Sequence, residues 1–324
     1  IKSSAASDVY KRQEFAAQGG WTSYWTSPGS RYFNPAGVGS YFDAGAGAGG
    51  AIVPIYTYTL DDANRATITG YSGNATALYI PGEIDGHEVV AIGDRAFENR
   101  TDLRTVMIPD SVTEMGGYAF NNCTNLSNVT LSKNLESMGS SAFGNCDGLT
   151  QIEIPKSLDV GGDYYSGAFA DCANLKKVTF ERGTTKIASN LLCGCTGIEK
   201  IDIPDTVKVI QVCAFKECKN LSTVNIPDSV IEIEGWAFES CSVLTKIGIP
   251  NQTLSIAGAA FRNCTSLTDI HLPSMLKAIS SSTFEGCKKL TTINFPSTLT
   301  MIGNSAFSGC CLLYTSPSPR DLST

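Results

Sequence analysis

The stretch Ile226–Leu244, with the sequence IPDSVIEIEGWAFESCSVL, is the unit from which most of the chain is copied. The next copy, IPNQTLSIAGAAFRNCTSL, begins at Ile249, and the preceding one, IPDTVKVIQVCAFKECKNL, begins at Ile203. One phenylalanine marks each copy, and the usual step between markers is 23 residues. The markers are Phe97, Phe120, Phe143, Phe169, Phe215, Phe238, Phe261, Phe284 and Phe307, with Leu192 in that position once. Tandem copies of this length predict a repeat architecture.

The residue types within one copy predict its local structure. Val224–Ile226 alternates apolar and polar side chains, which is typical of a half-buried strand. Pro227 ends that strand because proline cannot donate a main-chain hydrogen bond. Val230 and Ile233 are expected to point inward, and Phe238 to lie in a single helical or 3₁₀ turn. Since so short a strand is unstable alone, neighbouring copies must stack in a parallel sheet with strands about 4.8 Å apart.

The pattern C-x-x-L-x-x-V-x-I-P-x-S-V-x-x-I-x-x-x-A-F recurs in register from Ile80 to Cys310. It resembles the leucine-rich repeats of the BspA-like surface proteins of bacteria and some protists. The resemblance implies a leucine-rich-repeat solenoid, a right-handed α/β superhelix with a β-rich N-terminal cap. Short parallel strands would lie on its concave face, and turns or short helices on its convex face. It also implies an extracellular or cell-surface location.

Local departures from the pattern are few. Leu131-Ser132 and Phe180-Glu181 replace Ile-Pro, and Arg100 occupies the first cysteine position. The copy around Phe169 carries three extra residues, since the step from Phe143 is longer than the usual period.

The chain divides by composition into five parts. Ser3–Gln13 and Cys311–Asp321 match the translation of a sequencing-library transposon adapter, so we expect both ends to be adapter-derived and the native chain to be broken there. Two runs, Tyr56–Leu60 and Ala66–Tyr71, flank a turn-prone segment and predict a hairpin in the cap. The expected divisions are 1–13 adapter-derived, 14–54 a Gly- and aromatic-rich linker or remnant, 55–91 the cap, 92–310 the repeats and 311–324 adapter-derived.

Charge and hydropathy argue against nucleic-acid binding and against a membrane span. The formal net charge is −7, and such an acidic chain argues against a nucleic acid, whose phosphates require a basic surface. No run of 18 apolar residues is present, so we expect no membrane span.

Twelve cysteines raise the question of disulfides or zinc. Nine of them share one repeat position and would form a column, which we interpret as reduced, buried thiols. The alternatives are a Cys193–Cys213 bridge between two off-register cysteines, or a four-thiolate zinc site that adds Cys195 and Cys218. The column cysteines are Cys123, Cys146, Cys172, Cys195, Cys218, Cys241, Cys264, Cys287 and Cys310.

Catalytic motifs are missing from the sequence. Its two histidines, His87 and His271, belong to no metal-binding or nucleophile motif. We therefore expect neither an enzyme nor a cofactor.

The candidate binding residues lie on the outward face of the repeated strand and in one loop. Lys177, Lys200 and Lys246 would form a modest basic stripe, beside the polar residues Asp202, Asn225 and His271. The loop Asp159–Gly167 holds the extra residues and contains Tyr164 and Tyr165, and such insertions often carry specificity. The alternatives are a merely solvated face and a tolerated insertion.

These observations favour a non-enzymatic binding or adhesion module whose partner is a macromolecule, most simply a protein, met by an extended curved surface. One alternative is the spacer of a larger enzyme or wall-anchored protein whose functional domain lies elsewhere. Another is a purely architectural stalk.

Overall fold

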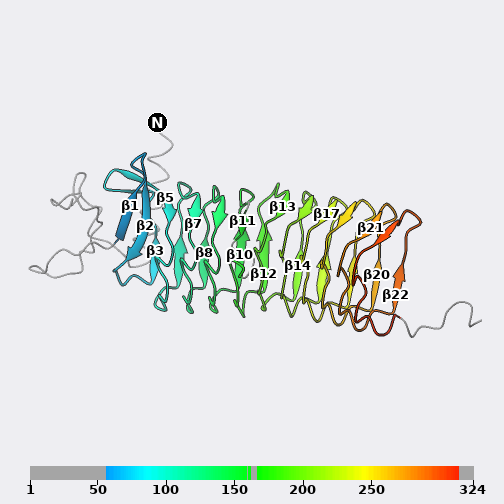
Figure 1. Cartoon of the computed structure of the whole chain (residues 1–324). Coiled ribbons are helices and arrows are strands. Elements are labelled where there is room, and N and C mark those ends of the chain that lie inside the picture. Colours follow the sequence, from blue (N-terminus) through cyan, green and yellow to red (C-terminus); the bar gives the residue numbers. More distant parts are fainter. Residues whose placement is uncertain (1–55, 159, 162–165, 314–324) are drawn as a thin grey trace, which may run out of the picture.

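The computed structural model describes residues 56–158, 160–161 and 166–313 of the 324-residue chain. These residues form a stack of coils along one axis, from β1 at the blue end to β22 at the orange end (Figure 1). Each repeat contributes two short parallel strands that pair with the equivalent strands of neighbouring repeats. The molecule is therefore a parallel β-solenoid.

An antiparallel hairpin begins the stack. It consists of β1 (Tyr56–Leu60) and β2 (Ala66–Tyr71), so the hairpin prediction is confirmed at both strands. β2 also pairs in parallel with β5 (His87–Ile92), to which the short β4 (Glu83–Ile84) is antiparallel. The hairpin thus joins directly onto the parallel strands of the solenoid.

The first ladder contains the strand that the repeat pattern predicts. Its central residue is an inward Val or Ile, or Leu78 in the first strand, and pairing is in register: Ile247 lies opposite Ile270, and Ile270 opposite Ile293. The hydrogen-bonded pairing is interrupted between some neighbours, such as β12 and β14, although these strands remain side by side. The strands are β3 (Ala77–Tyr79), β6 (Thr105–Met107), β8 (Asn128–Thr130), β10 (Gln151–Ile154), β12 (Lys177–Phe180), β14 (Lys200–Asp202), β16 (Thr223–Asn225), β18 (Lys246–Gly248), β20 (Asp269–His271) and β22 (Thr292–Asn294).

A second ladder was not anticipated from the sequence. Two residues of each repeat, ending in an inward apolar side chain such as Ile233, pair in parallel with the next copy. Two residues are too few to show an alternating pattern, so no sequence signal separated them from a turn. Besides β5, its strands are β7 (Glu114–Met115), β9 (Ser137–Met138), β11 (Val160–Gly161), β13 (Lys186–Ile187), β15 (Val209–Ile210), β17 (Glu232–Ile233), β19 (Ser255–Ile256), β21 (Ala278–Ile279) and β23 (Met301–Ile302).

The expected helical turn around each marker, and with it the α/β class, is wrong for the described residues, which contain no helix. Residues two before and two after the marker have positive φ, as Trp236 (56°) and Ser240 (61°) do around Phe238. This left-handed backbone cannot continue a right-handed helix. The main-chain N–H groups instead donate to the next coil, for example from Phe238 to the carbonyl of Ala260 at 2.8 Å. Right-handed winding and a concave strand face stay predictions.

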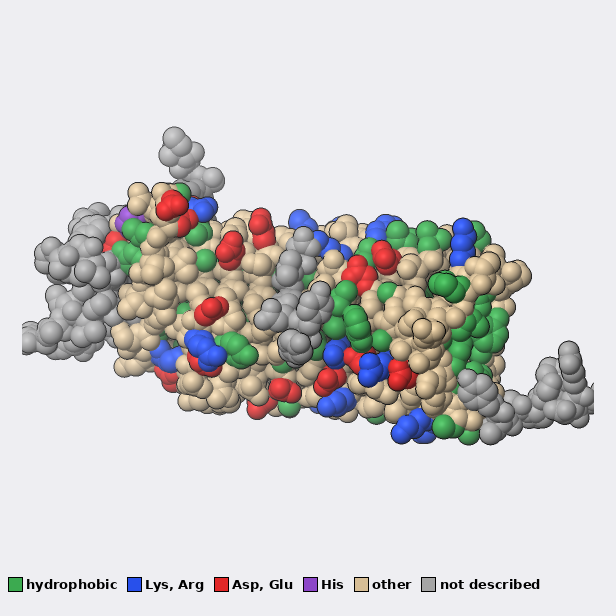
Figure 2. All heavy atoms as spheres, viewed as in Figure 1, with side chains coloured by type: hydrophobic (Ala, Val, Ile, Leu, Met, Phe, Trp, Pro, Cys, Tyr) green, Lys and Arg blue, Asp and Glu red, His purple; other side chains and the backbone are tan. Residues whose placement is uncertain are grey.

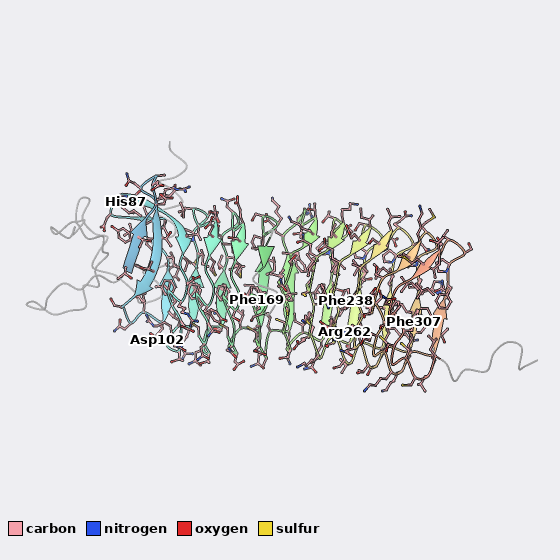
Figure 3. All side chains as sticks on the ribbon, in the orientation of Figure 1. His87, Asp102, Phe169, Phe238, Arg262 and Phe307 are labelled. Carbon is pink, nitrogen blue, oxygen red and sulfur yellow. The ribbon has the colours of Figure 1, made fainter. Side chains whose placement is uncertain are left out.

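The marker column forms the core. Eight marker phenylalanines are almost fully buried, which confirms the predicted burial, while Phe307 in the last coil is half-buried. Figure 3 labels Phe169, Phe238 and Phe307 along the stack. Adjacent rings stack in parallel, with centroids 5.5 Å apart between Phe238 and Phe261. The column therefore gains burial at each inner coil, and ring stacking wherever two successive markers are phenylalanine.

The cysteine column has a bonding role that the sequence did not reveal. Each column thiol donates to the main-chain carbonyl of the marker in the preceding coil, as Cys241 does to Phe215 at 3.2 Å. The same geometry holds for all nine column cysteines, at distances from 3.0 to 3.3 Å. Each thiol adds a donor to a carbonyl oxygen inside the core, which an alanine could not do, and most of these carbonyls also accept a main-chain N–H, as Phe215 does from Cys218 at 3.1 Å.

The first coil shows why Arg100 replaces cysteine. No marker carbonyl precedes this coil, because the hairpin lies there. The Arg100 guanidinium instead donates to the carbonyls of Tyr71 (3.3 Å) and Gly73 (2.8 Å) in the cap. It also lies over the Tyr71 ring, 4.8 Å from the centroid, and pairs with Asp102 at 2.7 Å. Arginine therefore ties the first repeat to the cap.

The outer face of the last coil lacks a covering coil among the described residues. Met301 and Ile302 are 58% and 53% exposed, whereas Ile279, which precedes Ile302 by one repeat, is 1% exposed. Figure 2 shows apolar side chains gathered at this end of the stack. The contrast measures how much each coil depends on its neighbour for burial.

Candidate functional site

The outward face of the first ladder is built by the alternation of its strands. In β14, β16, β18 and β20 the central Val or Ile is buried, and the residues before and after it are exposed. Because the buried residue is fixed in the core, the two outer residues are held at regular positions on each coil. The result is a surface of two parallel columns, which we call the ladder face.

All three predicted lysines lie in the leading column of the ladder face and are exposed. Lys177 and Lys200 lie on neighbouring strands, but Thr223 lies opposite Lys200 and separates it from Lys246. The Lys200 amine pairs with Asp202 at 3.2 Å, with both side chains more than 60% exposed. Such an exposed pair adds little stability, but it partly neutralises the stripe.

The second column brings the predicted polar residues partly together. Asp202 and Asn225 lie opposite each other on paired strands. His271 is exposed and lies opposite Gly248, which has open space where a side chain would be. Gly248 therefore leaves a gap between Asn225 and His271. The structure places Asp202 with Asn225 and leaves His271 apart.

The two tyrosines of the inserted loop, Tyr164 and Tyr165, lie outside the described residues, so their role stays a prediction.

Hydroxyl groups beside the ladder face are used by the fold. Thr268 donates to the carbonyl of Thr245 and Thr291 to that of Thr268, at 3.2 and 3.1 Å. Ser222 donates to Glu199 in the same way at 3.1 Å. These hydroxyls connect each coil to the one before it, so their hydrogen bonds serve the fold.

Aromatic anchors lie away from the ladder face, on the turns. Tyr118 and Trp236 are 36% and 41% exposed, and both occupy the left-handed position two residues before a marker phenylalanine. Arg95 lies over the Tyr118 ring at 4.5 Å. Aromatic and arginine side chains often dominate binding energy at interfaces. These residues were not predicted as candidates, although their fixed spacing from the marker was a usable signal in the sequence.

Chemistry at the cysteines is disfavoured by their surroundings. All twelve are free thiols in this structure, and every one except Cys311 is buried. Burial raises the pKa of Cys264 to about 12 and that of Cys310 to about 11. A thiol with so high a pKa is a poor nucleophile at neutral pH.

Within 56–158, 160–161 and 166–313, no three or more His, Cys, Asp or Glu side chains are grouped so as to hold a metal ion. The same ranges contain no helix of the length and hydropathy needed to cross a membrane.

Two parallel ladders, a buried marker column and a repeat near 23 residues define the class as a leucine-rich-repeat-like β-solenoid. Residues 90–211 and 185–313 match the BspA type leucine rich repeat region, so the chain belongs to that family. No curated protein matches the chain.

Several solved structures are similar to this chain. A leucine-rich repeat protein from Bacteroides ovatus is 22% identical, with 81% of this chain and 93% of that chain covered and a TM-score of 0.46. A leucine rich cell surface protein from Faecalibacterium prausnitzii is 29% identical, with 80% and 92% covered and a TM-score of 0.38. The pneumococcal vaccine antigen PcpA is 19% identical, with 76% and 75% covered and a TM-score of 0.45.

Proposed function

We propose that this chain is a non-enzymatic binding module, located outside the cell or on its surface, that meets a protein partner with its ladder face. The observation that carries the proposal is the ladder face itself, where exposed side chains flank a buried residue on strand after strand. A repeated, rigid array of this kind suits an extended macromolecular surface better than a small molecule, which needs a concave pocket.

The expected interface is broad, with its affinity spread over many positions. Lys177, Lys200, Lys246, Asn225 and Asp202 would contribute moderate polar contacts, because none is a buried anchor. His271 would add a contact at the far side of the Gly248 gap, and Tyr164 and Tyr165 would extend the surface from the inserted loop. Electrostatic contacts at exposed lysines act chiefly on the rate of association and weaken with salt.

The test is capture of a protein partner from cell-surface extracts, followed by affinity measurement with purified partner. One variant carries Lys177→Glu, Lys200→Glu and Lys246→Glu, and a second carries Tyr164→Ala and Tyr165→Ala. A matched control changes the same amount of charge at exposed lysines outside the ladder face, namely Lys208→Glu, Lys277→Glu and Lys288→Glu.

We expect both ladder-face and loop variants to bind more weakly than the control. If the partner binds both as tightly as the unmodified chain, while the control variant loses binding, the ladder face is not the interface. The proposed location, outside the cell or on its surface, is tested separately. Protease treatment of intact cells that carry the native gene should release the repeat domain.

A further inference from the structure

A second group of cations lies at the corner between the two ladders, away from the ladder-face lysines. Lys133, Lys156 and Arg182 each follow the Ile-Pro position of consecutive repeats. Ile154 lies opposite Phe180 in the first ladder, which brings Lys156 level with Arg182 two residues later. We call these three residues the corner row.

The spacing of the corner row is fixed by main-chain contacts between coils. The Ser157 hydroxyl donates to the carbonyl of Lys133 at 2.9 Å, so the first two coils of the row are directly joined. The main-chain N–H of Glu181 donates to the carbonyl of Ile154 at 2.9 Å and joins the second to the third. Strand spacing then places the main chains of successive corner residues about 4.8 Å apart, so the row spans about 10 Å along the stack.

The cations of the corner row are exposed and incompletely neutralised. Lys156 pairs with Glu181 at 3.3 Å, while Lys133 and Arg182 make no ion pair within the described part of the chain. The Lys156 main-chain N–H donates to the Glu181 carboxylate at 3.1 Å. That bond, together with the charges of Lys156 and Lys133, lowers the pKa of Glu181. One carboxylate therefore stays ionised among three cations.

The row is short and bounded at both ends. The equivalent position is Asp110 in the preceding repeat, whose carboxylate accepts from the main-chain N–H of Lys133 at 2.9 Å. In the two following repeats the position is Asp205 and then Asp228. A long polyanion lying along the stack would meet these carboxylates and the overall charge of −7, whereas a ligand with two or three anionic groups would meet only the cations.

We propose that the corner row binds a short acidic segment of a partner protein, with carboxylates at alternate positions of an extended strand. Alternate side chains of a strand point the same way and lie about 7 Å apart, which flexible lysine side chains can reach. Arg182 would hold one carboxylate with its planar guanidinium, and the two lysines would hold the others. The inference rests on the proposed binding function and names one chemistry that the partner would present.

The test uses a defined probe, a fluorescein-labelled peptide Gly-Glu-Thr-Glu-Thr-Glu-Gly, titrated with the purified chain at low salt. A peptide with Gln in place of every Glu is the probe control. The corner variant carries Lys133→Glu, Lys156→Glu and Arg182→Glu. The ladder-face variant, Lys177→Glu with Lys200→Glu and Lys246→Glu, changes the net charge equally and is the protein control.

We expect the corner variant to lose at least about tenfold in probe affinity and the ladder-face variant less than about threefold. Raising the salt about sixfold should weaken probe binding to the unmodified chain, because exposed charges are screened. A milder variant with Gln at the three corner positions removes the charges without reversing them. It should also lose probe affinity, and it replaces the first variant in the test if that variant does not fold.

If the corner and ladder-face variants lose the same amount of probe affinity, net charge alone explains the loss and the proposal is overturned. Equal binding of the Glu and Gln peptides would overturn it as well, and tighter binding of a single-stranded oligonucleotide than of the peptide would assign the row to nucleic acid. These results are distinct from failure of the ladder-face function, which is measured with the captured protein partner and not with the peptide.

Discussion

The marker column and the leading column of the ladder face come from the same repeat, yet they vary differently along the stack. The marker is phenylalanine in every copy except that of Leu192. The ladder-face column changes from copy to copy, reading Thr105, Asn128, Gln151, Lys177, Lys200, Thr223, Lys246, Asp269 and Thr292. A marker ring such as Phe261 is stacked between the rings of Phe238 and Phe284, whereas ladder-face side chains such as Lys200 and Lys246 are exposed to water.

This difference indicates which positions of the repeat can acquire binding specificity. An inward side chain must match the size of the same residue one coil away, because the interior is close-packed. An outward side chain has no such constraint, so substitutions there change stability little. Residues that carry binding are therefore expected at outward positions that depart from the repeat pattern, as the corner row does.

The largest expected effect concerns the cysteine column as a whole at alkaline pH. Burial raises the pKa of these thiols above the ordinary value of 9, to about 12 for Cys123 and Cys172. Unfolded thiols ionise near their ordinary pKa while folded ones stay protonated, so their contribution to stability is full below about pH 8.5 and falls above it. The loss should approach about 1.4 kcal/mol per pH unit for each thiol.

Chemical denaturation between pH 8 and 11, with thiolate absorbance recorded in parallel, checks this prediction. The absorbance should rise together with loss of the β-sheet circular dichroism signal. A thiolate signal that rises near pH 9 while the fold remains intact would show that the column is accessible to solvent.

Truncation of one marker should have the next largest effect. Phe238→Ala removes a fully buried ring that lies 5.2 Å from Phe215 and 5.5 Å from Phe261, so we expect a loss of about 3–5 kcal/mol in the free energy of unfolding. The matched ladder-face variant, Thr223→Ala, should change stability by less than about 0.5 kcal/mol. Urea denaturation measures both free energies of unfolding. Similar losses in the two variants would contradict the proposed difference between the marker column and the ladder-face column.

A single thiol should matter less than a marker ring. Cys241→Ala removes one of two donors to the Phe215 carbonyl, which keeps the main-chain N–H of Cys218 at 3.1 Å, so the loss should be about 0.5–1.5 kcal/mol. Cys311→Ala changes an exposed cysteine and is the control, expected within about 0.5 kcal/mol of the unmodified chain. If Cys241→Ala proves as neutral as the control, the thiol merely fills space.

The thiols should also be reduced in the folded protein. Alkylation of the unfolded chain without prior reduction, followed by mass spectrometry, should modify every column cysteine. Intact disulfides between successive column cysteines would contradict the thiol-to-carbonyl bonding of the column, and a Cys193–Cys213 disulfide would contradict the free thiols at those two positions.

The smallest expected effect is that of the N-terminal thirteen residues, which we interpret as adapter-derived. Deleting residues 1–13 should leave the melting temperature unchanged, because the repeats and the hairpin supply the packing of the cap. A clear fall in melting temperature on deletion would show that these residues contribute structure.

Several features of the molecule could be predicted from the sequence because they depend on periodicity. The 23-residue step fixed the inward positions, and the structure confirms the buried marker phenylalanines and the hairpin of β1 and β2. Exposure of Lys177, Lys200 and Lys246 also follows from alternation around a buried residue. Periodicity reports which way a side chain points, and that property is local.

Other features were decided only by the stacking of coils. The second ladder, the left-handed turns and the carbonyl that each thiol meets all depend on how one coil lies on the next. Stacking also decides which cations have partners. Lys156 pairs with Glu181 of the next coil, whereas Lys133 and Arg182 are left without an ion pair among the described residues. The repeat therefore determines the scaffold, and the distances between charges on adjacent coils determine where its surface keeps unpaired charge, because electrostatic interactions depend on separation in space and not in sequence.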